Sequence, residues 1–166
     1  IYLIRDPRDV AVSYAHHFEK DIDMVINNMI KTDAQITNPK KTIGTPLSSW
    51  DVHIQSWEML NVPKLIIRYE DLIKKPEKIF SKIINFLKNN LKINFEINKQ
   101  KFNSIIKNTN FKSLKKMEME GGFPEQISTR VFFRKGIYEA GKELNDARSN
   151  KIISNFNNVM KRFNYI

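Results

Sequence analysis

The 166-residue sequence contains no cysteine. Disulfide bonds and thiolate metal sites are therefore excluded, and the redox compartment is left undetermined. No apolar run approaches the roughly 20 residues that a membrane-spanning helix needs, and no signal peptide opens the chain. The chain also lacks a Gly-x-x-x-x-Gly-Lys-Ser/Thr motif, which argues against a kinase-like nucleotide enzyme.

The composition is that of a globular protein with a strong basic excess. A hydrophobic content of 41% over 166 residues predicts a single domain, residues 1–166, with a real core. The net charge of +10 is uneven: residues 1–60 carry 6 basic and 8 acidic side chains, and residues 61–166 carry 22 and 10. Such an excess favours an anionic partner, whether a nucleotide, a nucleic acid or an acidic polymer.

The first eighteen residues predict a strand, a sharp turn and a helix. Residues 1–4 form a short apolar run typical of a buried strand. Asp6 suits a helix N-cap, Pro7 suits the first helical position, and Asp9 would complete an acidic capping box. The helical period then predicts that one face of this helix carries Val10, Tyr14, His17 and Phe18.

Two residues of this segment are suited to hold a phosphate. Arg5 follows the carboxyl end of the strand, where open α/β sheets bind ligands. Ser13 lies on the flank of the following helix. A guanidinium fork and a hydroxyl on rigid elements can grip a phosphate. The alternative is that Arg5 pairs with Asp9 and Ser13 faces solvent.

The middle of the chain predicts two more helices around a loop. Residues 21–31 can form a short helix, and residues 37–46 are rich in helix breakers and are expected to be a loop. Ser48 and Asp51 predict a capping box for a helix ending near Leu60. Its inner face would be apolar and aromatic, so we assign His53 no catalytic role. The residues of that face are Trp50, His53, Ile54 and Trp57.

A second strand-to-helix succession follows. Residues 62–69 are expected to form a buried parallel strand, and Pro76 opens a helix with a clear apolar stripe. Repeated strand-to-helix switches are the α/β pattern. A helix is expected at residues 98–108, and a last helix, capped by Asp146, would turn six apolar side chains inward: Ile152, Ile153, Phe156, Val159, Met160 and Phe163.

Four segments, in order along nearly the whole chain, carry a family resemblance. They are Arg5-Asp-Pro-Arg-Asp-Val-Ala-Val-Ser13, Arg68-Tyr-Glu-Asp71, Thr109-Asn-Phe111 and Arg134-Lys-Gly136. Together they resemble the sulfotransferases that use 3′-phosphoadenosine-5′-phosphosulfate (PAPS), of the soluble cytosolic type. Each segment alone is unspecific, but their combination in this order is hard to obtain by accident.

The resemblance implies a role for each of these segments. Arg5 and Ser13 would bind the 3′-phosphate, and the Arg134-Lys135-Gly136 segment would close over it. This set of residues is chemically suited to a phosphate. A guanidinium can donate two hydrogen bonds to it, an ammonium adds a point charge, and glycine lets the backbone approach it.

The adenine part of the implied site comes from two other segments. Tyr69 would contact the adenine, while Thr109 and Phe111 would enclose the nucleotide. An aromatic face stacked on a base is worth roughly 1–3 kcal/mol by analogy with single-strand binding. The alternatives are that Tyr69 packs in the core and that Phe111 and Leu114 form a short core helix.

The family further implies the fold, the reaction and the setting. We expect an α/β fold with a three-layer parallel sheet and flanking helices, similar to P-loop nucleotide hydrolases. The expected reaction moves a sulfuryl group from PAPS to the hydroxyl or amine of a small-molecule acceptor, without a metal or a membrane, in the cytoplasm. The alternative is a basic nucleotide- or nucleic-acid-binding module without catalysis, against which the dispersed basic residues and the lack of a known motif argue.

The sequence also departs from the family pattern. The opening strand, the loop for the 5′-phosphosulfate and the usual histidine base are absent, so we expect a C-terminal part of an N-terminally truncated domain and assign no catalytic residue. We do not assign His16 or His17 as the catalytic base. After Gly136 the glycine is displaced to Gly141 and no tryptophan follows. This removes support for a homodimer contact made by some relatives.

Overall fold

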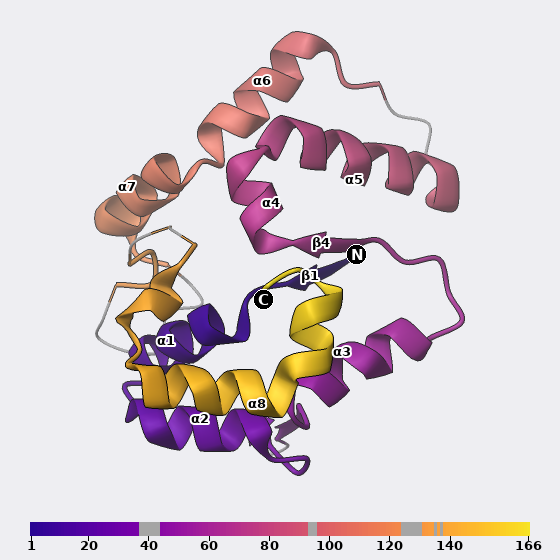
Figure 1. Cartoon of the computed structure of the whole chain (residues 1–166). Helices are drawn as coiled ribbons and strands as arrows, with labels where there is room; N and C mark the ends of the chain where they lie inside the picture. The colour runs from indigo at the N-terminus through magenta and orange to yellow at the C-terminus, as the bar shows by residue number, and fades with distance from the viewer. Residues whose placement is uncertain (37–43, 93–95, 124–130, 135, 137) are drawn as a thin grey trace. The chain divides into compact units, whose positions relative to one another are not determined.

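The computed structural model describes residues 1–36, 44–92, 96–123, 131–134, 136 and 138–166. In the described part of the chain, the short strands occur up to residue 68, and the elements that follow this residue are helical (Figure 1). The elements in chain order are β1 (Tyr2–Ile4), α1 (Pro7–His17), α2 (Ile22–Ile30), β2 (Gln35–Ile36), β3 (Thr45–Pro46), α3 (Trp50–Met59), β4 (Ile66–Arg68), α4 (Tyr69–Lys74), α5 (Pro76–Leu91), α6 (Lys99–Asn108), α7 (Phe111–Gly121), the 3-10 helix η1 (Ala140–Glu143) and α8 (Asp146–Arg162).

The chain divides into two compact units. The inserted unit consists of residues 1–3 and 63–138, most of which lie in the sequence between the two segments of the other unit. The flanking unit consists of residues 4–62 and 139–166.

The strands β1 and β4 pair as a two-stranded parallel sheet (Figure 1). The Tyr2 N–H donates a hydrogen bond of 2.9 Å to the Leu65 carbonyl. The strand β4 leads directly into α4 at Tyr69, and β1 is followed by α1. The predicted strand-to-helix succession is confirmed at both places, although the second strand is shorter than the predicted residues 62–69.

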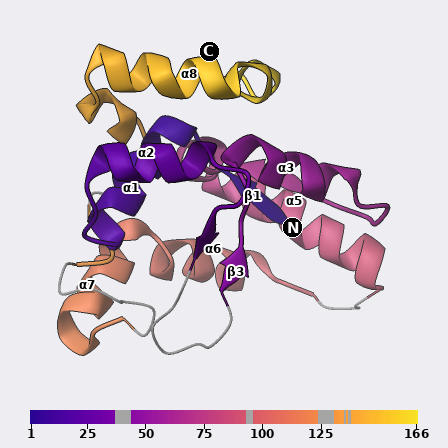
Figure 2. The ribbon, with the colours of Figure 1, turned by 90° about the horizontal axis from the view of Figure 1, so that it is seen from below.

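A separate antiparallel hairpin is formed by β2 and β3 (Figure 2). Gln35 pairs with Pro46, and Ile36 pairs with Thr45. The sequence predicted a loop over residues 37–46, and this was wrong for Thr45 and Pro46, whose backbone pairs with β2. Residues 37–43 lie outside the described part of the chain.

Helix α1 begins as the sequence predicts. Asp6 is its N-cap and accepts a hydrogen bond of 2.9 Å from the Arg8 N–H, and Pro7 is its first residue. Its buried apolar side chains are Ala11 and Val12, because α1 packs against α2, α8 and η1. The four residues predicted to share one helix face are half-buried: Val10, Tyr14, His17 and Phe18.

Helix α8 contributes most to the core of the flanking unit. It packs against α1, α2 and α3, and the ring of its Phe156 lies 5.2 Å from the ring of Trp50. Four of the six side chains predicted to face inward are buried, while Ile153 and Phe163 are half-buried. The other helices add Val25, Ile26, Met29 and Ile54 to this core.

Two helix caps lie one residue away from the predicted position. The N-cap residue of α3 is Ser49 instead of Ser48, and its Oγ donates to Asp51 Oδ1 at 2.7 Å. The N-cap of α8 is Asn145 instead of Asp146, because the Asn145 side chain accepts the Arg148 N–H at 3.0 Å. In both cases two adjacent residues are able to cap, so the residue pattern does not distinguish them.

The inserted unit has a sparse apolar core. Its helix α5 starts at Pro76, as predicted, and α6 (Lys99–Asn108) lies within the predicted helix 98–108, with Asn98 as its N-cap. Among the described residues of this unit, the buried apolar side chains are Ile67 and Ile79. The rest of the α5 stripe is half-buried. In neither unit does a described helix have the length and apolar character needed to span a membrane.

Candidate functional site

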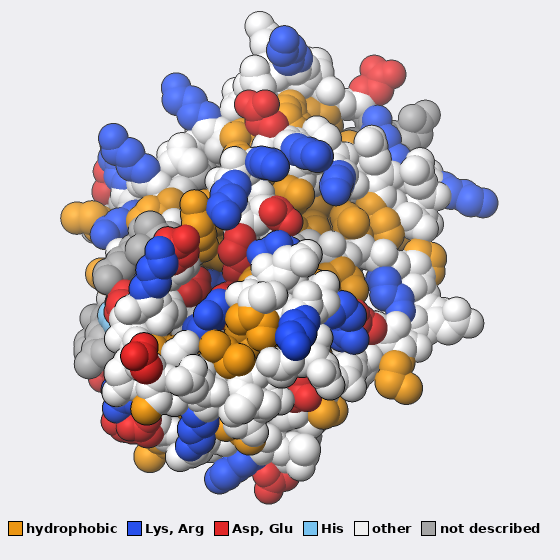
Figure 3. Space-filling view, in the orientation of Figure 1, with side chains coloured by type: hydrophobic (Ala, Val, Ile, Leu, Met, Phe, Trp, Pro, Cys, Tyr) orange, Lys and Arg blue, Asp and Glu red, His pale blue; other side chains and the backbone are white. Residues whose placement is uncertain are grey.

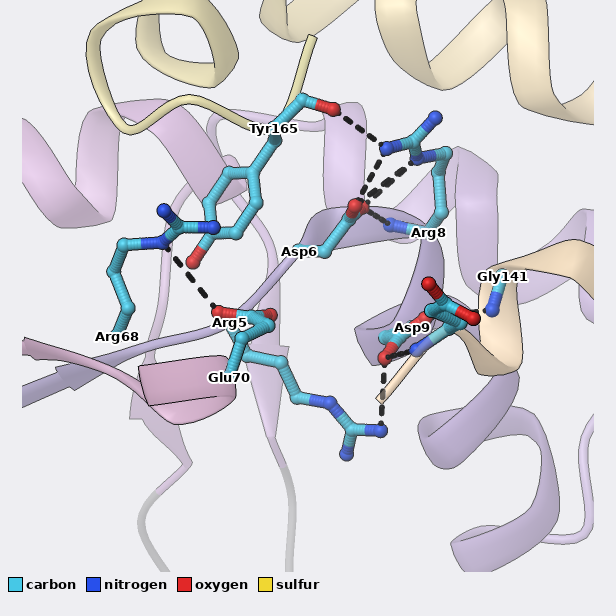
Figure 4. A network of polar contacts seen from close by, with 9 residues as sticks. Arg5, Asp6, Arg8, Asp9, Arg68, Glu70, Gly141 and Tyr165 are labelled. Carbon is cyan, nitrogen blue, oxygen red and sulfur yellow. Dashed lines mark hydrogen bonds and ion pairs between the residues drawn. The ribbon is translucent and has the colours of Figure 1, made fainter. Parts of the chain in front are cut away.

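Arg5 forms an ion pair with Asp9 in the flanking unit (Figure 4). Arg5 Nη2 lies 3.2 Å from Asp9 Oδ2, and the Asp9 side chain is only 2% exposed. The pairing that the sequence left open as an alternative is therefore present. A guanidinium carries five N–H donors, so this contact is compatible with a phosphate bound to the same side chain.

Asp9 also holds a distant part of the chain. The Glu139 N–H donates to its Oδ2 at 2.9 Å, and the Gly141 N–H donates to its Oδ1 at 2.6 Å (Figure 4). Gly141 is required there, because an added Cβ would lie 2.5 Å from Arg8 Cβ. Asp9 thus fixes η1, a role beyond the predicted capping box. The signal in the sequence is an acid beside the apolar run 10–12, since a buried acid needs donors.

Arg8 stabilises the N-terminal turn of α1. Its Nε donates to Asp6 Oδ1 at 3.0 Å, and its Nη2 donates to Asp6 Oδ2 at 2.6 Å and to the Tyr165 carbonyl at 2.8 Å (Figure 4). The hydrogen bond to Asp6 raises the pKa of Arg8 above its ordinary value. Arg8 therefore links the N-cap of α1 to the residues that follow α8.

Ser13 lies on α1 and is half-buried. One helix and its N-terminal turn therefore place both Arg5 and Ser13 in the flanking unit. The histidines of this unit make local contacts. The His17 ring lies 4.8 Å from the Phe18 ring, and His53 Nδ1 lies 3.1 Å from the Leu47 carbonyl. These contacts give neither histidine a catalytic role.

In the inserted unit, Gly136 lies directly against the ring of Phe111. Its φ is +61°, and an added Cβ would lie 2.0 Å from Phe111 Cδ2. Both the backbone conformation and the close approach therefore require glycine. The structure thus brings together two residues that the sequence assigned to the site from separate segments.

Arg134 is connected to the same helix as Phe111. Lys115 Nζ, on α7, donates to the Arg134 carbonyl at 3.2 Å, and the Arg134 N–H donates to the Phe132 carbonyl at 3.0 Å. The Arg134 residue is half-buried. Lys135, the middle residue of the predicted signature, lies outside the described residues.

Tyr69 and Thr109 come from two other segments of the inserted unit. Tyr69 is the first residue of α4, directly after β4, and is half-buried. Thr109 caps the end of α6, and its Oγ1 donates to the Ile105 carbonyl at 2.7 Å. A hydroxyl that donates still has acceptor capacity. The alternative for Phe111, a short core helix with Leu114, is present only as a helix: α7 begins at Phe111, and both side chains are half-buried.

The flanking unit contains an open pocket of about 490 Å³ between α3 and the β2–β3 hairpin. Apolar side chains on its wall include Val52, Trp57 and Leu60, and His53 and Ser56 add polar groups. Trp57 is 47% exposed, so its predicted place in the core was wrong. A pocket with an aromatic wall and a few polar groups suits a small amphiphilic molecule.

The net charge belongs entirely to the inserted unit. Residues 1–3 and 63–138 carry 17 basic and 7 acidic side chains, whereas the flanking unit carries 11 of each. On the face shown in Figure 3, basic side chains are spread among acidic and apolar ones. Within the described residues, no group of three or more histidine or acidic side chains could hold a metal ion.

The chain belongs to the sulfotransferase domain family, whose model matches residues 1–164. It is 31% identical over 143 residues to a 3-beta-hydroxysteroid sulfotransferase of Cavia porcellus, covering 82% of this chain and 47% of that protein. It is 32% identical over 143 residues to cytosolic sulfotransferase 12 of Arabidopsis thaliana, covering 82% and 41%. The chain thus spans about half the length of these curated relatives.

Two solved structures, each with PAP, share the fold. Mouse sulfotransferase SULT7A1 complexed with PAP matches with a TM-score of 0.70 at 22% identity, over 96% of this chain and 56% of that chain. Retinol dehydratase in complex with androsterone and PAP matches with a TM-score of 0.68 at 20% identity, over 96% and 46%. The predicted P-loop-like α/β fold is confirmed.

Proposed function

We propose that this chain forms the 3′-phosphate and adenine half of a PAPS site. It would belong to an enzyme that transfers a sulfuryl group to an acceptor hydroxyl or amine. The family match and the PAP named with the similar structures support this proposal. The observation that carries it is the contact of Gly136 with Phe111, which leaves no room for a Cβ in the signature segment.

In this proposal Arg5 and Ser13 of the flanking unit are candidate ligands of the 3′-phosphate, and residues 134–136 are proposed separately as a phosphate-binding segment of the inserted unit. The two arginines supply charge-assisted hydrogen bonds, Ser13 a neutral one, and Lys135 a point charge. Gly136 allows the backbone to approach the phosphate. The excess of 10 positive charges in the inserted unit favours an anionic ligand.

The adenine would be enclosed by aromatic and hydroxyl side chains. Phe111 offers a ring already fixed against Gly136 and edge-to-face with Phe133, at 6.1 Å between centroids. Tyr69 and Thr109 would add a second ring and a hydrogen-bonding hydroxyl. A fixed ring stacks on a base with little loss of conformational entropy.

PAPS supplies the sulfuryl group, which passes to the acceptor oxygen or nitrogen while adenosine 3′,5′-bisphosphate (PAP) leaves. The residues of this chain would position the nucleotide and balance its charge, as positioning groups do in phosphoryl transfer. The chain has no residue that we assign as the general base. We therefore expect the 166 residues alone to bind PAP without turning over PAPS.

The open pocket of the flanking unit supports a small-molecule acceptor. Its wall combines an indole ring with hydroxyl and imidazole groups, which fits an acceptor with an apolar body and a polar end. The name of the Arabidopsis relative supports a cytoplasmic location. Residues 1–166 would form part of a single sulfotransferase domain, consistent with the family match over residues 1–164.

A calorimetric titration of the full gene product with PAP, adenosine 5′-phosphate, ATP and duplex DNA tests the proposal. PAP should bind most tightly, and Arg134→Ala should weaken PAP binding while leaving adenosine 5′-phosphate binding unchanged. Lys116→Ala is the matched control, because it removes a positive charge from an exposed side chain of the same unit.

Preferential binding of DNA would favour the alternative, a nucleic-acid-binding module. Equal losses for PAP and adenosine 5′-phosphate in Arg134→Ala would instead show that Arg134 serves the fold.

A further inference from the structure

Glu118 binds the backbone just before the Arg134–Gly136 segment. Its Oε1 accepts a hydrogen bond from the Phe132 N–H, and its Oε2 accepts one of 2.9 Å from the Phe133 N–H. Both carboxylate oxygens are thus used by two consecutive amides, immediately before Arg134. Both contacts lie within the inserted unit.

One face of α7 contacts residues 132–134 and Gly136. Phe111, Lys115 and Glu118 are spaced by four and three residues, so they share a helix face. The Phe111 ring contacts Gly136, Lys115 binds the Arg134 carbonyl, and Glu118 binds the two preceding amides. The backbone is therefore fixed before, at and after Arg134 by a single helix.

The burial of Glu118 is specific to this face. Glu118 is 7% exposed, whereas its neighbours Met117 and Met119 are 62% and 76% exposed. A buried carboxylate is costly unless its oxygens accept hydrogen bonds. Glu118 is buried beside a basic segment, whereas the neighbouring methionines are exposed. This indicates that the contact of Glu118 with residues 132 and 133 stabilises the conformation of that segment.

We propose that Glu118 is a positioning residue for the 3′-phosphate loop: its carboxylate holds the two amides so that Arg134 and Gly136 keep a phosphate-binding conformation. This inference rests on the proposed function. Glu118 itself does not touch the nucleotide, because both its oxygens face the backbone of residues 132 and 133.

The test removes one of the two carboxylate oxygens with which Glu118 accepts the Phe132 and Phe133 N–H groups. Glu118→Gln keeps the length of the side chain but has one acceptor oxygen, so one of the two amides loses its partner. We expect PAP affinity to fall by roughly tenfold or more, since a lost charge-assisted hydrogen bond has about this effect. Adenosine 5′-phosphate affinity should change by less than about twofold. The control is Glu120→Gln, an exposed acid of the same helix, which should change neither.

Two further readouts separate positioning from general destabilisation, both on the full gene product. Hydrogen exchange of the Phe132 and Phe133 amides should be slow in the wild type and faster in Glu118→Gln. In the Arg134→Ala background, Glu118→Gln should produce a much smaller further loss of PAP affinity than in the wild type, because the arginine is already absent and only Gly136 remains to be positioned.

The outcomes distinguish this inference from the function on which it rests. If Arg134→Ala changes the preference for PAP and Glu118→Gln does not, the role of Glu118 is refuted and the proposed function stands. If Arg134→Ala leaves that preference unchanged, the proposed function itself fails. If hydrogen exchange of the Phe132 and Phe133 amides is unchanged in Glu118→Gln, the positioning role of Glu118 is also refuted.

Discussion

The two units of the chain are stabilised in different ways. The flanking unit contains nearly all the buried apolar side chains of the described chain, and its charges balance at 11 of each sign. The inserted unit buries Ile67 and Ile79 and has 10 more basic than acidic side chains. The first unit is therefore held by apolar burial, whereas the second depends on polar contacts such as those of Glu118, and gains most from an anionic ligand.

The largest effect should come from the apolar core of the flanking unit. Ile26 is 0% exposed, so Ile26→Ala should lower the free energy of unfolding by about 2–5 kcal/mol. Ile84→Ala, at a half-buried position of α5, should cost clearly less. Urea unfolding of both variants measures the difference. Equal losses would remove the contrast between the units.

The phosphate contacts should give the next largest effect. Arg5→Ala should weaken PAP binding by roughly 1.5–3 kcal/mol and Ser13→Ala by about 0.5–1.5 kcal/mol, because Arg5 would make the charge-assisted bonds. Arg5→Lys should be a poor rescue, since an ammonium lacks the planar fork. Titration calorimetry with PAP and adenosine 5′-phosphate measures this order.

The fold should survive Arg5→Ala, because Asp9 keeps the Glu139 and Gly141 amides as partners. If Arg5→Ala unfolds the protein, or binds PAP as the wild type does, Arg5 is only the structural partner of Asp9.

A glycine pair sharpens the contrast within the inserted unit. Gly136→Ala should cost at least about 1 kcal/mol, because its φ is +61° and the new Cβ would overlap the Phe111 ring. Gly121→Ala should be neutral or stabilising by up to about 1 kcal/mol, since this helical glycine has no atom within 4 Å of its added Cβ. Thermal unfolding compares them, and a tolerated Gly136→Ala would argue against the tight contact with Phe111.

The smallest effect concerns an exposed ion pair of the flanking unit. The hydrogen bond from Arg148 lowers the pKa of Asp23 below its ordinary value of 3.8. The stabilisation is therefore present above pH 3.8 and is lost as the pH falls through the lowered pKa. Asp23→Asn should lose this acid-dependent part. Urea unfolding of the wild type and Asp23→Asn at several pH values measures this part of the stability. The difference in stability between the two proteins should vanish in high salt.

The elements were largely predictable from the sequence. Apolar periodicity located the core side of α8, and Asp6, Pro7 and Asn98 marked helix starts, because these signals are local. The inner face of α1 and the exposure of Trp57 were not predictable. Both depend on packing partners far away in the sequence, as with η1 against α1.

The candidate site was predictable only in part. The sequence assigned Phe111 and Gly136 to the site, and the structure adds their direct contact. The sequence did not indicate Lys115 and Glu118, because α7 carries charged residues on several sides and only the fold shows which of them face residues 132–134. The sequence predicts Asp9 as a capping residue, but its bonds to Glu139 and Gly141 follow only from the tertiary structure.

The bonds of Asp9 have a consequence for how the protein is made. They join residue 9 to residues 139 and 141, and the bond from Arg8 to Tyr165 spans a similar stretch. The flanking unit therefore cannot complete its core until the ribosome has synthesised α8, and closing so long a loop is entropically slow. The nascent inserted unit, whose helix pairs α4–α5 and α6–α7 are close in sequence, can start to fold earlier. The apolar residues of the flanking unit would meanwhile stay exposed to chaperones, so the rate of synthesis should influence the yield of folded protein.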